Sequence, residues 1–177
     1  TANGATTASE RSATITIAGL SAPVRQSGIE VEGSTLVPIL LSSAGAADAF
    51  FTSELTLTNR GTTSALAELT YTAALGGGSG TGTDVIPAGG QITIADAIGY
   101  LRSAGVPIPA TGNRGGTLRL RLLGVSSPSA VSATARTTSV VPGGRAGLAY
   151  ADVPAGAAFH EPVTLCGLRQ NANDRSN

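Results

Sequence analysis

The stretch Phe50–Thr72 carries the clearest pattern of apolar and polar positions in the chain. Leu55 and Leu57 in its first half, and Leu69 and Tyr71 in its second half, alternate with threonine and glutamate. A period of two places successive side chains on opposite faces of a strand, so each half is predicted to be a strand with one buried face. A short polar break separates the halves, which predicts that they pair as an antiparallel hairpin.

The same alternation predicts further strands on both sides of this hairpin. Pro38 cannot donate a hydrogen bond to a neighbouring strand, so its strand is expected at a sheet edge or with a β-bulge. A turn of serine and proline at 126–129 permits a second hairpin. The expected additional strands are Ser12–Ile17, Ser34–Leu41, Thr83–Ile86, Gln91–Ile94, Thr117–Leu123, Ala130–Val141, Gly143–Ala151 and Glu161–Leu168.

One short segment, Asp96–Ala104, has the pattern of a helix. Ile98 and Leu101 share a face, Asp96 suits the N-terminal cap and Gly105 suits the C-terminal exit. Eight to ten strands with frequent turns and one capping helix are typical of an all-β protein. We therefore predict an antiparallel, immunoglobulin-like β-sandwich.

Composition excludes several partners. The chain has 177 residues, 11 basic and 11 acidic side chains, and a net charge of +0. This balance gives no electrostatic attraction to nucleic acid or an anionic membrane, and no apolar run is long enough for a membrane helix. Charged residues make up only 12% of the chain, which favours association between molecules.

The arginines of two predicted strands offer either an anion-binding patch or cross-strand ion pairs. Arg119, Arg121 and Arg136 occupy the polar positions of these strands. Because arginines on a solvated face are usually hydrated or paired, we expect them to pair with Glu54 and Glu68.

The sequence contains no recognisable combination of catalytic residues, and we expect no enzymatic activity. His160 is the only histidine and has no nucleophile motif near it, while Cys166 is the only cysteine and fits a small buried hydrophobe. Asn171, Asn173 and Asp174 could offer oxygens to structural calcium. They lack the closing glutamate of a dedicated loop, so turn chemistry is the expected interpretation and no cofactor is predicted.

A carbohydrate-binding or adhesive module is the alternative function. Such a module binds polysaccharide through aromatic platforms, but the chain has no tryptophan and only 3% aromatic residues. Tyr100 and Tyr150 are the candidate platforms. The chain also lacks methionine, so we expect either a secreted product of signal-peptide removal or a fragment of a longer protein.

Four blocks of sequence, within the range 34–177, resemble a module of large secreted and cell-surface proteins of bacteria. They are STLVPILLSSAGAADAFFTSELTLTNRGTTSA, IADAIGYLRSAGVPIP, GNRGGTLRLRL and LCGLRQNANDRSN. Those modules occur in tandem and are immunoglobulin- or fibronectin-like sandwiches. The resemblance implies an extracellular structural or adhesive role without a cofactor.

Residues 1–33 lie outside this resemblance and form an N-terminal extension to a sandwich domain at 34–177. The extension contains one predicted strand, in which Ala13, Ile15 and Ile17 alternate with polar residues. An extended segment can add to an open sheet edge of another molecule, and repeated head-to-tail addition builds filaments. We therefore hypothesise a subunit of a fibre, pilus-like filament or surface array that self-associates by strand donation. Pairing of this strand within its own domain is the simpler alternative.

Overall fold

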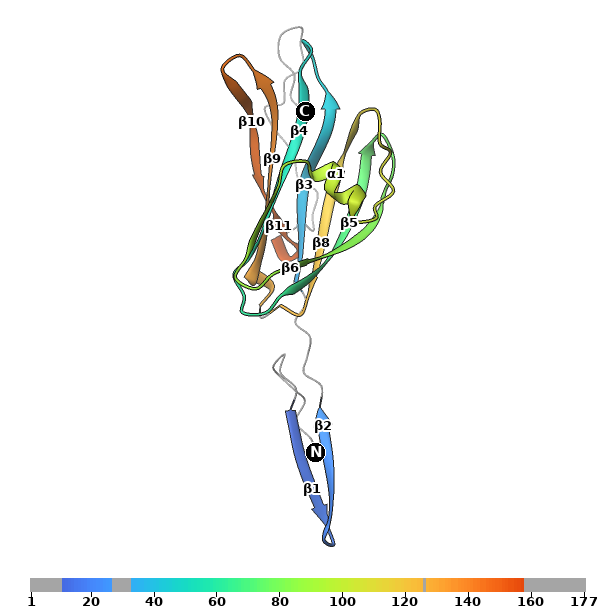
Figure 1. Cartoon of the computed structure of the whole chain (residues 1–177), viewed down its shortest axis with the longest axis vertical. Helices are drawn as coiled ribbons and strands as arrows, with labels where there is room; N and C mark the ends of the chain where they lie inside the picture. The colour runs from blue at the N-terminus through green and yellow to red at the C-terminus, as the bar shows by residue number, and fades with distance from the viewer. Residues whose placement is uncertain (1–10, 27–32, 126, 158–177) are drawn as a thin grey trace.

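The computed structural model describes residues 11–26, 33–125 and 127–157, which are mostly strand (Figure 1). Eleven strands, one α-helix and two short 3-10 helices follow one another along these residues. In chain order they are β1 (Arg11–Ile17), β2 (Leu20–Gln26), β3 (Gly33–Ala44), β4 (Phe50–Asn59), β5 (Ala65–Leu75), β6 (Gly80–Ile86), β7 (Gln91–Ile94), α1 (Ala97–Ser103), β8 (Arg114–Leu123), η1 (Pro128–Ala130), β9 (Val131–Val141), β10 (Gly144–Ala151), β11 (Val153–Pro154) and η2 (Ala155–Ala157).

Nine strands form one antiparallel sheet, and β1 and β2 form a separate two-stranded sheet. The main sheet has the order β10-β9-β4-β3-β8-β5-β6, with β7 paired to β4 and β11 paired to β3. Strands β3 and β4 pair only where the chain turns between them, at Ser42–Ala44. Beyond this point β4 pairs with β7 and β3 pairs with β11, so the sheet divides into two branches. The prediction of an all-β, antiparallel protein is confirmed.

Both predicted hairpins are wrong, although their strands are present. Strand β4 pairs with β9, β7 and β3, whereas β5 pairs with β6 and β8; likewise β8 and β9 belong to different branches. The alternation of apolar and polar residues determines which face of a strand is buried, but this pattern does not depend on which strand lies beside it. It therefore could not identify the partner of either strand.

The side chain of Asn59 directs the chain from one branch to the other. It is 1% exposed and donates hydrogen bonds to the carbonyl oxygens of Thr63 (2.9 Å) and Ile86 (3.1 Å). Its own carbonyl oxygen accepts a hydrogen bond from the Gly61 amide at 2.9 Å. These bonds hold the β4–β5 connection against the end of β6, so β5 begins beside β6 instead of beside β4.

Both branches bury their apolar faces in a single hydrophobic core. Leu55 and Leu57 of β4, and Leu69 and Tyr71 of β5, are all 0% exposed, as the alternation predicted. The core cluster also contains Val37, Leu40, Ala65, Ala67, Ile86, Ala97, Ile98, Leu101, Val106, Ile108, Leu118, Leu120, Leu122, Val125, Val131, Ala133 and Ala135.

Two local predictions from the sequence are confirmed. Asp96 caps α1 by accepting a hydrogen bond from the Gly99 amide at 3.0 Å, and Gly105 leaves the helix with φ +98°. Ile98 and Leu101 anchor this helix in the core. The register between β3 and β8 shifts between Val37 and Leu40, so Pro38 lies at a bulge within a central strand.

Candidate functional site

The N-terminal extension contains a hairpin of two strands, where the sequence predicted one. Ala13, Ile15 and Ile17 of β1 pair with Val24, Ala22 and Leu20 of β2. The expected single-strand extension is therefore wrong. Pro23 and the polar residues around it concealed β2. The connecting Ala18 and Gly19 have φ values of +51° and +80°, as a two-residue hairpin turn requires, but this pair is not one of the usual turn signals.

One face of this hairpin is apolar and uncovered. Residues directly opposite one another in an antiparallel pair project from the same face, so Ala13 and Ile15 share a face with Leu20, Ala22 and Val24. Ile15 is 49% exposed, Leu20 is 79% exposed and Val24 is 43% exposed. The opposite face is polar, and there Thr16 and Ser21 lie 3.0 Å apart through their hydroxyl oxygens.

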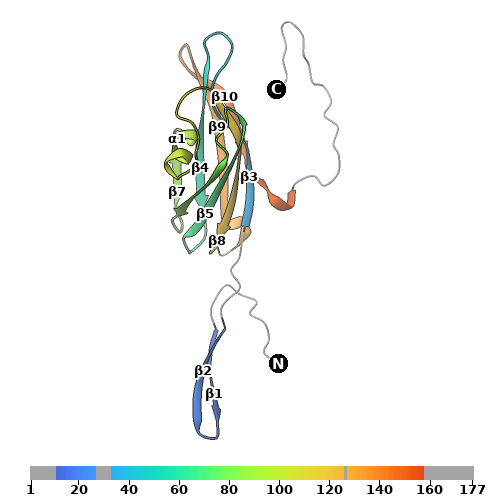
Figure 2. The same cartoon turned by 90° about the vertical axis from the view of Figure 1, so that its right-hand side faces the viewer.

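The hairpin forms no strand pairs with the main sheet in the described part of the chain. The pairings of β1 and β2 are with each other alone. Figures 1 and 2 both draw the hairpin apart from the sheet, beyond the end at which β3 begins. A two-stranded hairpin by itself is at best marginally stable in water, because it has no core. This apolar face therefore needs a covering surface.

Strand β10 is an exposed edge of the main sheet. It has eight residues, pairs with β9 along one side and has no strand on its other side among the described residues. Arg145 is its only charged residue, and Leu148 is 65% exposed. Sheet edges that avoid unwanted pairing are usually short, charged or covered by another element. The edge of β10 is eight residues long, carries Arg145 as its one charge and is not covered by another element in the described residues.

A groove of about 330 Å³ runs beside this edge. Leu148 and Tyr150 of β10 line one side of it, Leu41 of β3 lies on the other side, and Phe51 and Thr137 are also part of its lining. The Leu41 amide donates a hydrogen bond to the Ser53 hydroxyl oxygen at 2.8 Å, so a side chain satisfies the β3 backbone here. The groove thus combines apolar walls with an adjacent free strand edge, which are the features that receive an added strand.

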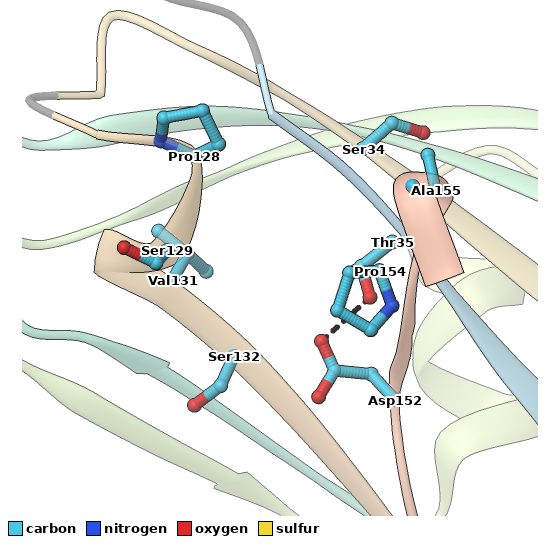
Figure 3. A pocket seen from close by; sticks show the side chains of 10 residues that line it. Ser34, Thr35, Pro128, Ser129, Val131, Ser132, Asp152, Pro154 and Ala155 are labelled. Atoms are coloured by element: carbon cyan, nitrogen blue, oxygen red, sulfur yellow. Dashed lines mark hydrogen bonds between the residues drawn. The ribbon is translucent and has the colours of Figure 1, made fainter. Parts of the chain in front are cut away.

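A second cavity, of about 380 Å³, lies between η1 with the start of β9 on one side and the paired strands β3 and β11 on the other (Figure 3). Asp152 is its one carboxylate, and the Thr35 hydroxyl donates a 2.6 Å hydrogen bond to it. The rest of the lining is serine, proline, valine, alanine and glycine. With a single acid already bound by Thr35, the cavity offers no acid–base pair. No group of three or more histidine, cysteine, aspartate or glutamate side chains able to hold a metal occurs in the described ranges.

The two candidate sugar platforms lie in different environments. The Tyr100 hydroxyl donates a 2.6 Å hydrogen bond to Asp84, and Tyr100, a residue of α1, packs against the core. Tyr150 lines the groove next to β10. The structure therefore does not bring these two rings together into one platform.

Because of Tyr100, the stability of the folded chain falls as the pH becomes alkaline. Burial, followed by the hydrogen bond to Asp84, raises the pKa of Tyr100 well above its usual value. A tyrosine pKa that is higher in the folded state gives stability that is complete below the unfolded pKa of about 10 and is lost as the pH rises above it.

We expect Tyr100→Phe to lower the free energy of unfolding at pH 8 by about 1–2 kcal/mol, through loss of the bond to Asp84. We also expect it to reduce the further loss between pH 8 and pH 11. Urea unfolding at both pH values measures this, with Tyr150→Phe as the control. An equal loss of stability with pH in the Tyr100→Phe variant and the unmodified chain would contradict the assignment.

Two of the three arginines form ion pairs with glutamates, as predicted. Arg121 lies 2.9 Å from Glu68, and Arg136 lies 3.1 Å from Glu54. Both pairs are solvent-exposed, and exposed pairs of this kind contribute little to stability. The interpretation as cross-strand ion pairs is confirmed for these two arginines.

The remaining candidate residues lie outside the described residues. They are His160, Cys166, the expected strand Glu161–Leu168 and the possible calcium ligands Asn171, Asn173 and Asp174. In the described ranges, no helix is both long and apolar enough to cross a membrane. Comparison of the chain with models of protein families, with curated proteins and with solved structures finds no match.

Proposed function

We propose that this protein is an extracellular structural subunit of a fibre, pilus-like filament or surface array. Subunits join by β-strand addition, in which the N-terminal hairpin of one molecule adds to the sheet of another. The observation that carries the proposal is the apolar face of the hairpin, which includes Ile15, Leu20 and Val24 and packs on no strand of the described sheet. Covering this face between molecules removes apolar surface from water and stabilises the hairpin at the same time.

The proposal includes the finer architecture. We propose that the two branches of the main sheet are the layers of an immunoglobulin-like β-sandwich, of the kind that the four sequence blocks resemble. One hydrophobic core shared by both branches supports this interpretation. The resemblance to modules of bacterial surface proteins supports an extracellular location. Residues 1–33 then act as the connecting extension, and residues 34–177 as the sandwich domain.

The alternative, a carbohydrate-binding or adhesive module, depends on exposed aromatic rings. Tyr100 is hydrogen-bonded to Asp84 and Tyr150 lies in the groove beside the free edge of β10. The same groove suits an extended peptide strand better than a sugar ring, because a strand also satisfies the backbone groups of the edge. We therefore prefer assembly as the function.

Substitution of the apolar face of the hairpin tests the proposal. We expect the double variant Ile15→Asp, Ile17→Asp to remain a folded monomer and to form no polymers, because it replaces two alternating apolar residues of the donor strand by charges. The matched control is Thr14→Asp, Thr16→Asp, which adds the same charge to the polar face of β1. Light scattering after size-exclusion chromatography gives the mass, and circular dichroism reports the fold.

The control variant should polymerise like the unmodified chain. Polymers of the same size distribution in the Ile15→Asp, Ile17→Asp variant would show that the hairpin is not the donor. Loss of polymers in both double variants would show that added charge, and not the apolar face, determines association.

A further inference from the structure

The edge of β10 combines two features that suit an added hairpin. Its backbone is unpaired along one side, and the groove next to it is lined by Leu41, Phe51, Leu148 and Tyr150. An added strand would therefore gain backbone hydrogen bonds from β10 and pockets for every second side chain. The apolar face of the β1–β2 hairpin is another uncovered apolar surface of the described residues.

We infer that the groove between β3 and β10 is the acceptor site for the β1–β2 hairpin of a second copy of this chain. This inference rests on the proposed function and names its acceptor. In the bound state β1 of the neighbour pairs with β10, and Ile15 packs beside Leu148 and Tyr150 in the groove. The lengths agree, because β1 has seven residues and β10 has eight.

The charges of the two surfaces are also compatible. The described side chains on the apolar face of the hairpin are uncharged, and Arg145 is the only charged residue of β10. The Arg145 side chain bonds to Thr138 (3.0 Å) and Thr52 (3.2 Å), and it is not among the residues that line the groove. A hairpin can therefore enter without burying an unpaired charge, which would be strongly unfavourable.

The hairpin of the same chain cannot simply extend the sheet at the start of its own β3, because β11 already pairs there with Thr35 and Leu36. The free edge of β10 is open to the hairpin of a second copy, which no connecting segment restrains.

Head-to-tail addition of this kind uses two different surfaces on each molecule. The donor of one copy and the acceptor of the next do not form a closed pair, so each added subunit offers a new free acceptor. The result is an open chain of subunits, as the proposed filament requires.

Substitution of one groove residue tests this assignment in the full chain. We expect Leu148→Asp to weaken association by about 100-fold or more, because it places an unpaired charge where the donor must pack. The matched control is Ala149→Asp, one residue further along the same strand, which by alternation projects from the other face and does not line the groove. Sedimentation velocity over a range of concentrations measures the association, and circular dichroism checks that both variants fold.

Mixing two defective variants makes the test specific. The Ile15→Asp, Ile17→Asp variant retains an intact acceptor, and Leu148→Asp retains an intact donor. Each should be monomeric alone, and their mixture should form dimers but no longer species.

The possible failures can be told apart. If Leu148→Asp polymerises like Ala149→Asp while the hairpin variant does not, the acceptor assignment is overturned and the proposed function stands. If the unmodified chain never associates, both are overturned. If the unmodified chain is monomeric and Leu148→Asp lowers its melting temperature, a segment of the same chain fills the groove, and the assignment to a second copy is overturned.

Discussion

Replacing Gly116 with alanine is expected to destabilise the main sheet by about 3 kcal/mol or more. Gly116 is buried in β8, between β3 and β5. A methyl group at this position would clash with the carbonyl oxygen of Thr72 and lie 2.9 Å from the ring carbons of Tyr71. Tyr71 is itself 0% exposed and is packed in the core. Relief therefore requires separation of β5 from β8.

Thermal and urea unfolding of Gly116→Ala measure this cost. Gly144→Ala is the matched control, because no atom lies within 4 Å of the position that its methyl group would occupy. We expect the control to change the free energy of unfolding by less than about 0.5 kcal/mol. An equally stable Gly116→Ala variant would show that the strands are not packed as closely as described.

Replacing Leu120 with alanine is expected to destabilise the protein by about 2–5 kcal/mol. Leu120 is 0% exposed and lies in the middle of β8, opposite Thr35 on one side and Leu69 on the other. Neighbouring strands hold the cavity walls apart, so the structure cannot collapse fully into the space that alanine leaves.

Leu148→Ala provides a comparison with the same side chain on the edge of the same sheet. Leu148 is 65% exposed, so its truncation should lower the stability of the monomer by about 0.5 kcal/mol or less. Chemical denaturation at a protein concentration that keeps the chain monomeric measures both variants. Equal losses for the two leucines would contradict the division between a buried core and an exposed edge.

The sequence predicted local structure better than it predicted strand partners. Alternation identified the buried residues Leu55, Leu57 and Leu69, and of the two alternatives for Pro38, an edge strand or a bulge, the structure has the bulge. These features depend on a few neighbouring residues. Pairing depends on where loops direct the chain, and the turn around Asn59 works through contacts with Ile86, which is distant in sequence. Such contacts leave no periodic signal.

The candidate acceptor could not have been found from the sequence for the same reason. Its lining residues Leu41, Phe51, Thr137 and Leu148 come from four strands that the sheet brings together. The candidate donor was visible as the alternating Ala13, Ile15 and Ile17, but its partner strand was not, because Pro23 interrupts the β pattern. The structure thus enlarges the predicted donor from a strand to a hairpin with an apolar face.

The association of the unmodified chain tests the central claim most directly. Sedimentation velocity across a hundredfold range of concentration, with negative-stain electron microscopy of the same samples, measures it. Open-ended assembly by the hairpin predicts a series of oligomers that lengthens with concentration and appears as linear filaments. A single monomeric species at every concentration, or one closed dimer, would contradict it.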